Sequence, residues 1–390
     1  MKVKLKELLI PQPKSKVKAG EGLIDGKYKF YTSSPIQSKY LDDAQYRGPA
    51  LIFGTGGNAS VHYCTDMFST STDCLVMYGS EELELIYYYL SGNVQILQDG
   101  FKGAGLKHIS KNYILNIEID LPCKETQREI VNIMKKIDVL ISERKQQKDQ
   151  MEKLVMSRFV EMFGDPENNY KAWPVKSLDK LCAVGSSKRI YQSEQSTEGV
   201  PFWRISDLVS KMDTGTVDNS LFISEIKYTE LKRAGLVPAT GDILVTSRGT
   251  LGRCYIIKDE DCFYFQDGMI SWLSNYSEEI TPLYLQYLFT MSGFRKQIDN
   301  MQAGSTVAYL SIAMLKRLQV MVPDKELQNQ FAAFVKQTDK SKFRRQKCLD
   351  KLKLIKNHDS GVFWGNRSGK NGFDTNTNRY IFTEITRNAI

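Results

Sequence analysis

One sequence pattern occurs twice in this chain. Residues 103–154 and 304–355 align without a gap at a constant offset of 201 residues, the separation of Pro122 from Pro323. The identical pairs include Gly103 and Gly304, Ser110 and Ser311, Lys124 and Lys325, Gln127 and Gln328, Lys135 and Lys336, Asp138 and Asp339, and Arg144 and Arg345. The apolar positions between them also agree in type. A duplication of this period predicts two similar halves and a pseudo-twofold molecule that can bind a partner at two separated places.

Each copy ends in a segment with the pattern of a long helix. Residues 123–163 contain no Gly or Pro, and Gly164, Asp165 and Pro166 then form a strong helix terminator. Spacings of three and four indicate a coiled-coil seam with a polar centre in each copy. The first seam is Ile130, Ile133, Ile137, Leu140, Arg144, Gln147, Met151 and Leu154. The second seam is Phe331, Phe334, Thr338, Ser341, Arg345, Cys348, Leu352 and Ile355.

The shared register of the two seams predicts that the helices pack on each other antiparallel. The alternative is two unrelated amphipathic helices, each on a separate core. A helix of about 40 residues rises about 60 Å. That length predicts a spacer that holds two globular units at a fixed distance.

The globular units have the patterns of mixed, β-rich domains. Short β-branched and aromatic runs at 201–205, 243–246 and 254–257 predict strands, as does 114–121 before Pro122. Apolar spacing predicts helices near 82–90 and 282–289. The expected fold is α+β, with two β-rich domains joined by two long antiparallel helices. The expected parts are a first domain at 1–122, a helix at 123–164, a second domain at 165–323, a helix at 324–357 and a tail at 358–390.

Composition narrows the range of partners and compartments. The 390 residues are 42% hydrophobic and 25% charged, which is typical of a globular protein. A formal net charge of +8 favours a polyanionic partner, although it could also serve solubility alone. The pattern contains no membrane span and no signal peptide. The seven cysteines form no C-x-x-C pair, so we expect reduced thiols in the cytoplasm.

Catalytic and cofactor motifs are incomplete. Residues 53–57 resemble the glycine-rich loop of methyltransferases that bind S-adenosylmethionine, but the chain lacks the Asn/Asp-Pro-Pro-Tyr/Phe segment that grips a flipped base. Residues 365–371 depart from the phosphate-binding loop in length and in the residue after Lys370. The three histidines form no metal or triad pattern. We therefore expect no metal, no cofactor and no catalysis in this chain.

Candidate DNA contacts fall in two families of loops. Residues 53–57 and 247–252 are predicted to be tight turns that present N–H groups to phosphate, with plain hairpin turns as the alternative. Arginine commonly reads guanine, and amide side chains read adenine. The candidates in the first domain are Asn58, Ser60, His62, Lys102 and Lys107. Those in the second are Lys188, Arg189, Tyr191, Arg204, Arg248, Thr250, Arg253, Gln302, Ser305, Thr306 and Tyr309. For any single member, a surface salt bridge or a solvated charge is the competing interpretation.

Together these features resemble the specificity subunit of type I restriction–modification enzymes. The segments that carry the resemblance are 119–130 and 320–331 in the repeat, 156–166, 173–178, 199–208, and Gly304 to Thr306 with Leu310 and Ser311. The likeness spans residues 1–357. Two features depart from it: the first domain lacks an obvious counterpart of Gly199-Val-Pro-Phe-Trp-Arg204, and residues 358–390 continue past the second helix.

The resemblance implies a chain that recognises DNA and does no chemistry itself. Each domain would read one half of a bipartite site in double-stranded DNA. The helices, around Gln127, Arg128 and Gln328, would dock methyltransferase (M) subunits, and a motor/nuclease (R) subunit would join for cleavage. A stand-alone DNA adenine methyltransferase and a protein-only helical adaptor are the alternative functions.

Overall fold

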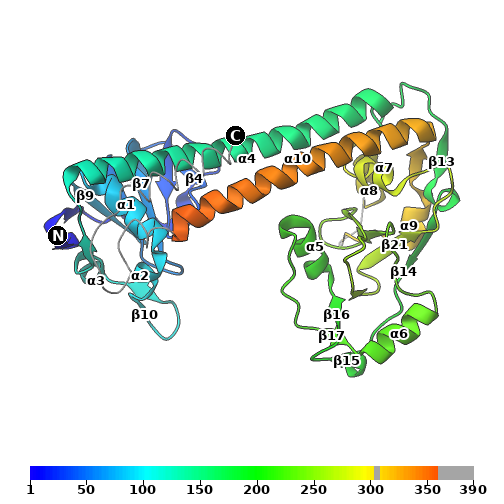
Figure 1. Ribbon diagram of the computed structural model, residues 1–390, viewed down its shortest axis with the longest axis horizontal. Helices are drawn as coiled ribbons and strands as arrows, with labels where there is room; N and C mark the ends of the chain where they lie inside the picture. Colours follow the sequence, from blue (N-terminus) through cyan, green and yellow to red (C-terminus); the bar gives the residue numbers. More distant parts are fainter. Residues whose placement is uncertain (303–307, 359–390) are drawn as a thin grey trace. The chain divides into compact units, whose positions relative to one another are not determined.

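The computed structural model describes residues 1–302 and 308–358, with side chains to Lys356 (Figure 1). It divides into two compact units, Met1–Lys148 with the chain from Phe343 onward, and Asp149–Lys342. Both long helices, α4 (Lys124–Phe163) and α10 (Lys325–His358), cross this division, so each unit contains part of both.

The two units have the same order of elements over most of their length. The first contains β1 (Lys2–Lys4), β2 (Leu9–Pro11), β3 (Tyr28–Tyr31), β4 (Lys39–Leu41), β5 (Tyr46–Arg47), β6 (Ala50–Gly54), β7 (Ser60–Cys64), β8 (Met67–Thr70), β9 (Cys74–Gly79), α1 (Leu83–Gly92), α2 (Val94–Gln98), β10 (Phe101–Lys102), β11 (His108–Ile109), α3 (Lys111–Leu115) and β12 (Glu118–Asp120). The second contains β13 (Val175–Ser177), β14 (Ala183–Ser186), β15 (Gln195–Ser196), β16 (Val200–Trp203), α5 (Ile205–Thr214), β17 (Phe222–Ile223), α6 (Glu225–Arg233), β18 (Ile243–Thr246), β19 (Cys254–Ile256), β20 (Tyr264–Phe265), β21 (Ile270–Ser274), α7 (Pro282–Leu288), α8 (Ser292–Met301), α9 (Ile312–Arg317) and β22 (Gln319–Met321).

Sheet topology repeats between the units and extends the duplication beyond the repeated sequence. The order β2-β9-β6-β7 in the first unit corresponds to β14-β21-β18-β19 in the second. A second sheet in each unit contains a parallel pair, β3 with β8 and β16 with β20. Strand β3 therefore occupies the place of β16 and supplies the counterpart of Val200–Trp203 that the sequence did not reveal. The predicted α+β fold with two related domains is confirmed.

A central buried strand explains how each unit is built. In β6, Leu51 and Phe53 pack into a core that also contains Ile130 of α4, whereas Ala50 and Ile52 face a second core. Strand β18 alternates in the same way between its own two cores. Side chains of a strand point alternately to opposite faces, so a strand that is apolar at every position must be covered on both sides. The ends of these two strands carry the candidate loops.

The helices α4 and α10 pack antiparallel within each unit, as predicted. In the first unit, Lys356 Nζ donates a hydrogen bond to Asp138, and Arg345 donates to Gln147. In the second, the rings of Phe159 and Phe331 lie 5.5 Å apart. Within the polar centre of the predicted seam, Arg345 and Gln147 bond across the two helices, whereas Thr338 and Ser341 bond to carbonyls of α10 itself.

Two local predictions are wrong. Leu154 is 54% exposed, and Val155 takes its place in the core with 1% exposure. A strict heptad seam drifts by about 20° per heptad on a straight helix, which shifts the buried position by one residue. The predicted strand at 114–121 begins only at Glu118, because Ser110 caps the short helix α3 by accepting a hydrogen bond from the Tyr113 N–H.

The repeated glutamine at the start of each long helix has a structural role. Gln328 is fully buried; its Nε2 donates to the carbonyls of Pro323 and Glu279, and its Oε1 accepts from Thr281 N–H at 2.8 Å. Gln127 repeats one of these bonds by donating to the Pro122 carbonyl at 2.9 Å. The glutamine therefore ties the first turn of the helix to the chain that enters it.

Gln328→Met should destabilise the second unit by about 2–3 kcal/mol, because buried groups would lose their hydrogen-bond partners. Trp173, Trp203 and Trp272, three of the four tryptophans, lie in this unit, so tryptophan fluorescence in urea measures its unfolding. Gln330→Met is the control at an exposed position two residues away and should change stability by less than about 0.5 kcal/mol. Equal urea midpoints for both variants would contradict the structural role.

Candidate nucleic-acid interface

A hairpin turn follows the central buried strand in each unit. Residues 55–59 connect β6 to β7, and residues 247–253 connect β18 to β19. Gly57, Gly249 and Gly252 have φ values of 80°, 68° and 74°, a conformation that favours glycine. Both predicted positions are turns, and they are equivalent in the two units. A plain hairpin turn, the alternative, has the same geometry, so contact with phosphate stays a prediction.

The second family of candidate loops lies against these turns. Ile109 N–H donates to the Thr55 carbonyl at 3.1 Å, and Leu310 N–H donates to the Ser247 carbonyl at 3.0 Å. Ile109 and Leu310 are separated by the repeat offset, so the same hydrogen bond occurs in both units. Two loop families that are far apart in sequence therefore meet at one strand end in each unit.

Sequence reasoning missed two further segments at this end. The β8–β9 loop contributes Asp73 in the first unit, and the β20–β21 loop contributes Met269 in the second. Their carbonyls accept from Thr55 N–H at 2.8 Å and from Ser247 N–H at 2.9 Å. The loop after β3 contributes Ser33, whose Oγ donates to the Asp73 carbonyl. These segments carry small polar residues without a basic or aromatic cluster, so composition gave no signal. These loops could have been found only by aligning the strand order of the two units.

The first unit offers three exposed candidates, one in the β6–β7 turn and two in the β10–β11 hairpin. Asn58, Lys102 and Lys107 are exposed. Ser60 is buried and donates to the Ser33 carbonyl at 3.1 Å, so it supports the loop after β3. His62 Nε2 lies 2.9 Å from the Ser34 carbonyl, and burial lowers the pKa of its ring.

In the second unit, three candidate arginines already have acidic neighbours. Arg189 pairs with Asp267 at 2.9 Å, and Arg253 pairs with Asp213 at 2.5 Å. The Arg253 pair lowers the pKa of the Asp213 carboxyl by hydrogen bonding. Arg204 caps α5 and lies 3.9 Å from Asp207. These pairs match the competing interpretation for single residues, and a DNA phosphate or base would have to exchange with a carboxylate.

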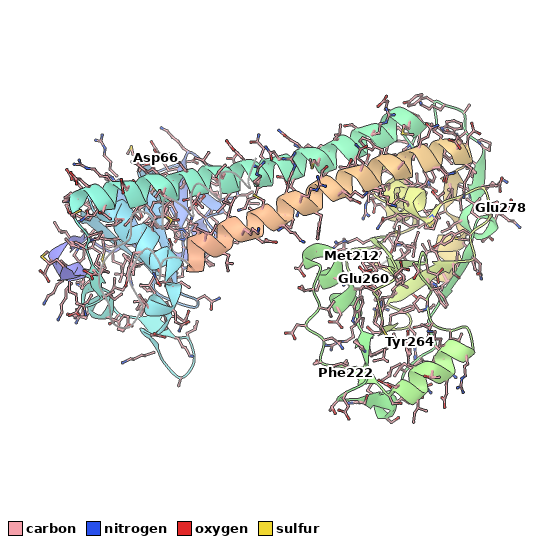
Figure 2. The ribbon with its side chains drawn as sticks, viewed as in Figure 1. Asp66, Met212, Phe222, Glu260, Tyr264 and Glu278 are labelled. Atoms are coloured by element: carbon pink, nitrogen blue, oxygen red, sulfur yellow. The ribbon has the colours of Figure 1, made fainter. Side chains whose placement is uncertain are left out.

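Of the remaining candidates, Lys188 is held by a backbone hydrogen bond, and the side chains of Tyr191 and Thr250 are exposed. The hydroxyl of Tyr264, which Figure 2 labels in this unit, accepts from Lys188 N–H at 2.8 Å, while the Lys188 side chain is exposed. The side chain of Tyr191 is 63% exposed. Thr250 is exposed at the tip of the β18–β19 turn.

Arg248 differs from the other arginines. It is exposed, its guanidinium lies 5.2 Å from the ring centroid of Tyr309, and it makes no ion pair with any described residue. The carboxylates of Asp242 and Asp267 are bonded to other side chains, Trp272 and Arg189. A ring under a guanidinium restricts its position without using its hydrogen-bond donors.

Gln302 holds the main chain of Tyr309. Its Nε2 donates to the Tyr309 carbonyl at 3.1 Å, and its Oε1 accepts from Tyr309 N–H at 2.8 Å. The amide is therefore used in positioning Tyr309. Ser305 and Thr306 lie outside the described residues.

The candidate partner-binding residues divide by exposure. Arg128 is exposed on α4, whereas Gln127 and Gln328 are buried in this chain. The two glutamines have little surface to offer a partner, because their amides bond locally. Docking along the helices stays a prediction that involves Arg128 and its exposed neighbours.

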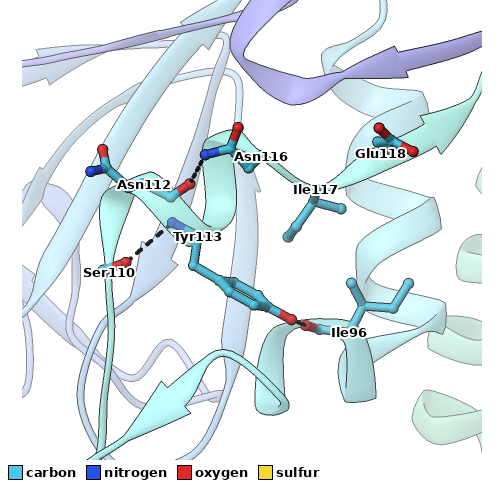
Figure 3. Close-up of a pocket in the computed structure, with 7 residues that line it drawn as sticks. All are labelled: Ile96, Ser110, Asn112, Tyr113, Asn116, Ile117 and Glu118. Atoms are coloured by element: carbon cyan, nitrogen blue, oxygen red, sulfur yellow. Dashed lines mark hydrogen bonds between the residues drawn. The ribbon is translucent and has the colours of Figure 1, made fainter.

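A hollow of about 520 Å³ in the first unit lacks the features of a ligand site (Figure 3). Its wall includes Tyr113, whose hydroxyl donates to the Ile96 carbonyl at 2.9 Å, and Asn116, whose amide donates to the Asn112 carbonyl at 2.8 Å. Each of these two donors already bonds to a backbone carbonyl of another residue of the wall. Within the described part of the chain, His, Cys, Asp and Glu form no group suited to a metal ion, and no helix could cross a membrane.

The chain has two related α+β units, and each carries an equivalent cluster of loops at the end of its central strand. This arrangement is that of a recognition protein with two related binding domains. Residues 1–153 and 170–353 match the model of the type I restriction modification DNA specificity domain. The chain belongs to this family.

Relatives agree with this assignment. The chain is 24% identical over 340 residues to a putative type I restriction enzyme specificity subunit of Haemophilus influenzae, covering 80% of each chain. It is 26% identical over 274 residues to the type I restriction enzyme MjaVIII specificity subunit of Methanocaldococcus jannaschii, covering 65% of this chain and 63% of that one. The fold is similar to the S subunit of a type I restriction–modification system from M. genitalium, with a TM-score of 0.56, 17% identity, and coverage of 94% and 96%.

Arg248→Ala should cost about 1–3 kcal/mol in specific binding and relax one position of the recognised sequence, if this guanidinium reads a guanine. Tyr309→Ala should relax the same position, while Tyr309→Phe should preserve it because the ring remains. Lys188→Ala is the control: it should weaken all sequences alike and lower the salt slope by about one. Sequencing of methylated sites reads the motif of all four variants, and DNA titrations at several salt concentrations measure affinity and salt slope. An unchanged motif in Arg248→Ala would remove Arg248 from the readers.

Proposed function

We propose that this chain is the DNA-recognition subunit of a cytoplasmic type I restriction–modification complex. Each unit reads one half of a bipartite site in double-stranded DNA through the loops at the end of its central strand. The observation that carries the proposal is the repeated hydrogen bond, Ile109 to Thr55 and Leu310 to Ser247, which builds the same loop cluster twice. Side chains on the two clusters differ, as two different half-sequences require.

Within the proposal, α4 and α10 set the separation of the half-sites and dock two M subunits. The packing of the two helices supports this role, because a pair resists bending better than a single helix. Exposed residues such as Arg128 and Val139, which is 56% exposed, offer docking contacts. The R subunit joins the complex for cleavage. The chain itself contributes no catalytic group and no cofactor; methyl transfer and its cofactor belong to the M subunits.

The proposal is tested by measuring DNA binding and methyl transfer for the chain with its M subunits and for the chain alone. The chain co-purified with its M subunits should shift a subset of genomic DNA fragments and methylate the same fragments. The chain alone should transfer no methyl group. Methyl transfer by the chain alone would favour the stand-alone methyltransferase, and a complex that binds no DNA would favour the protein-only adaptor.

A further inference from the structure

The second long helix carries a row of basic side chains on one exposed face. Lys336, Lys340, Arg344, Lys347 and Lys351 follow one another at intervals of four, four, three and four residues. In an α-helix this spacing places side chains on a single face, over a length of about 22 Å. All five residues are exposed. We call this row the basic stripe.

The charges of the basic stripe are not neutralised within the chain. Among the described residues, none of the five forms an ion pair, whereas Lys342 and Lys356 of the same helix pair with Asp339 and Asp138. Between Phe343 and Lys356 the helix has six basic residues and one acidic residue, Asp350. An unpaired row of like charges repels itself, so a polyanion bound along the face would relieve an electrostatic cost.

The repeated helix provides an internal comparison. At the repeat offset, Lys340, Arg344, Lys347 and Lys351 correspond to Val139, Glu143, Gln146 and Gln150 of α4. The fifth counterpart, Lys135, pairs with Glu84 at 2.8 Å. The shared helical framework therefore does not require the basic stripe, and only the second copy has it.

We propose that the basic stripe of α10 binds backbone phosphates of duplex DNA outside the two sequences that the units read. This inference rests on the proposed function. Lysine is a point charge suited to phosphate, and four of the five residues are Lys. Protein interfaces are depleted in Lys, which argues against an acidic protein surface as the occupant. Phosphate contacts add affinity without sequence information.

The test uses the full chain in complex with its M subunits and two variants of equal charge. The stripe variant is Arg344→Gln, Lys347→Gln and Lys351→Gln. The control variant is Lys145→Gln, Lys148→Gln and Lys353→Gln, three exposed basic residues outside the stripe. Loss of three phosphate contacts should lower the slope of log affinity against log salt by about 3 in the stripe variant alone. The methylated motif should stay unchanged in both.

A second probe locates the contact. Duplexes that contain the methylated motif are made with neutral methylphosphonates either in the spacer between the half-sequences or in the flanks. One of these duplexes should bind the wild-type complex more weakly, and the stripe variant should lose that sensitivity. Equal sensitivity of wild type and stripe variant to both duplexes would overturn the inference.

The other outcomes are also decisive. Equal slopes for the stripe and control variants would reduce the effect to net charge and overturn the inference. Loss of M subunits from the stripe variant, measured by mass, with an unchanged salt slope would assign the face to a protein partner instead. If the wild-type complex bound no specific DNA, the proposed function would fail first, before the stripe was tested.

Discussion

Replacing residues 165–322 with the corresponding segment of a relative should change one half of the recognised DNA sequence completely and leave the other half unchanged. The segment begins after Gly164, which follows α4, and ends before Pro323, which precedes α10. It carries the complete β18–β19 turn and the loops against it. The helices and the first unit remain those of the parent chain. Methylated-site sequencing of the chimeric complex measures the outcome.

The reciprocal replacement of residues 1–121 is the matched control and should change the opposite half. A chimera that recognises a new sequence at both halves would show that the units do not read independently. The strand pairs β1-β12 and β13-β22 each lie within the exchanged segments, so neither junction divides a sheet. Both chimeras should therefore fold.

Lengthening both long helices at facing positions should lengthen the non-specific gap between the two half-sequences of the DNA site. Both half-sequences should stay unchanged. Gln147 and Arg345 bond to each other, so a four-residue insertion after Gln147 is matched by one before Arg345. The added rise is about 6 Å, which corresponds to about one or two base pairs. The expected motif has the same two half-sequences with a longer gap.

An insertion in α4 alone is the control. It would shift Asp138 relative to Lys356 by about one helical turn and break the seam, so it should lower stability rather than produce a new spacing. Altered half-sequences in the double insertion would refute the role of the helices in setting the spacing.

The long helices, the central strands and the glycine turns could be predicted from sequence, because each is indicated by a strong pattern within one short segment. Forty residues without Gly or Pro can form one helix, and the segment 243–246 is apolar at three of four positions between turn residues. The glycine turns were also predictable, since their positive φ values favour the residue type found there. Because the sequence is duplicated, an element predicted in one half was also expected at the equivalent position of the other half.

The details of the recognition surface could not be predicted, because they depend on contacts between distant segments. Nothing local indicates that Ser33 bonds to Asp73, or that Asp213 neutralises Arg253. The repeated Gln328 suggested a partner contact, but its burial reflects local tethering of the helix. The seam was predicted to bury Leu154, but Val155 is buried instead, because a strict seven-residue repeat drifts around a straight helix.

Mapping of methylated sites in cells that carry this chain with its M subunits tests the central claim most directly. The two equivalent loop clusters predict a single bipartite motif, two short sequences separated by a non-specific gap of constant length. A continuous motif, or two half-sequences that are methylated at variable separation, would contradict the account.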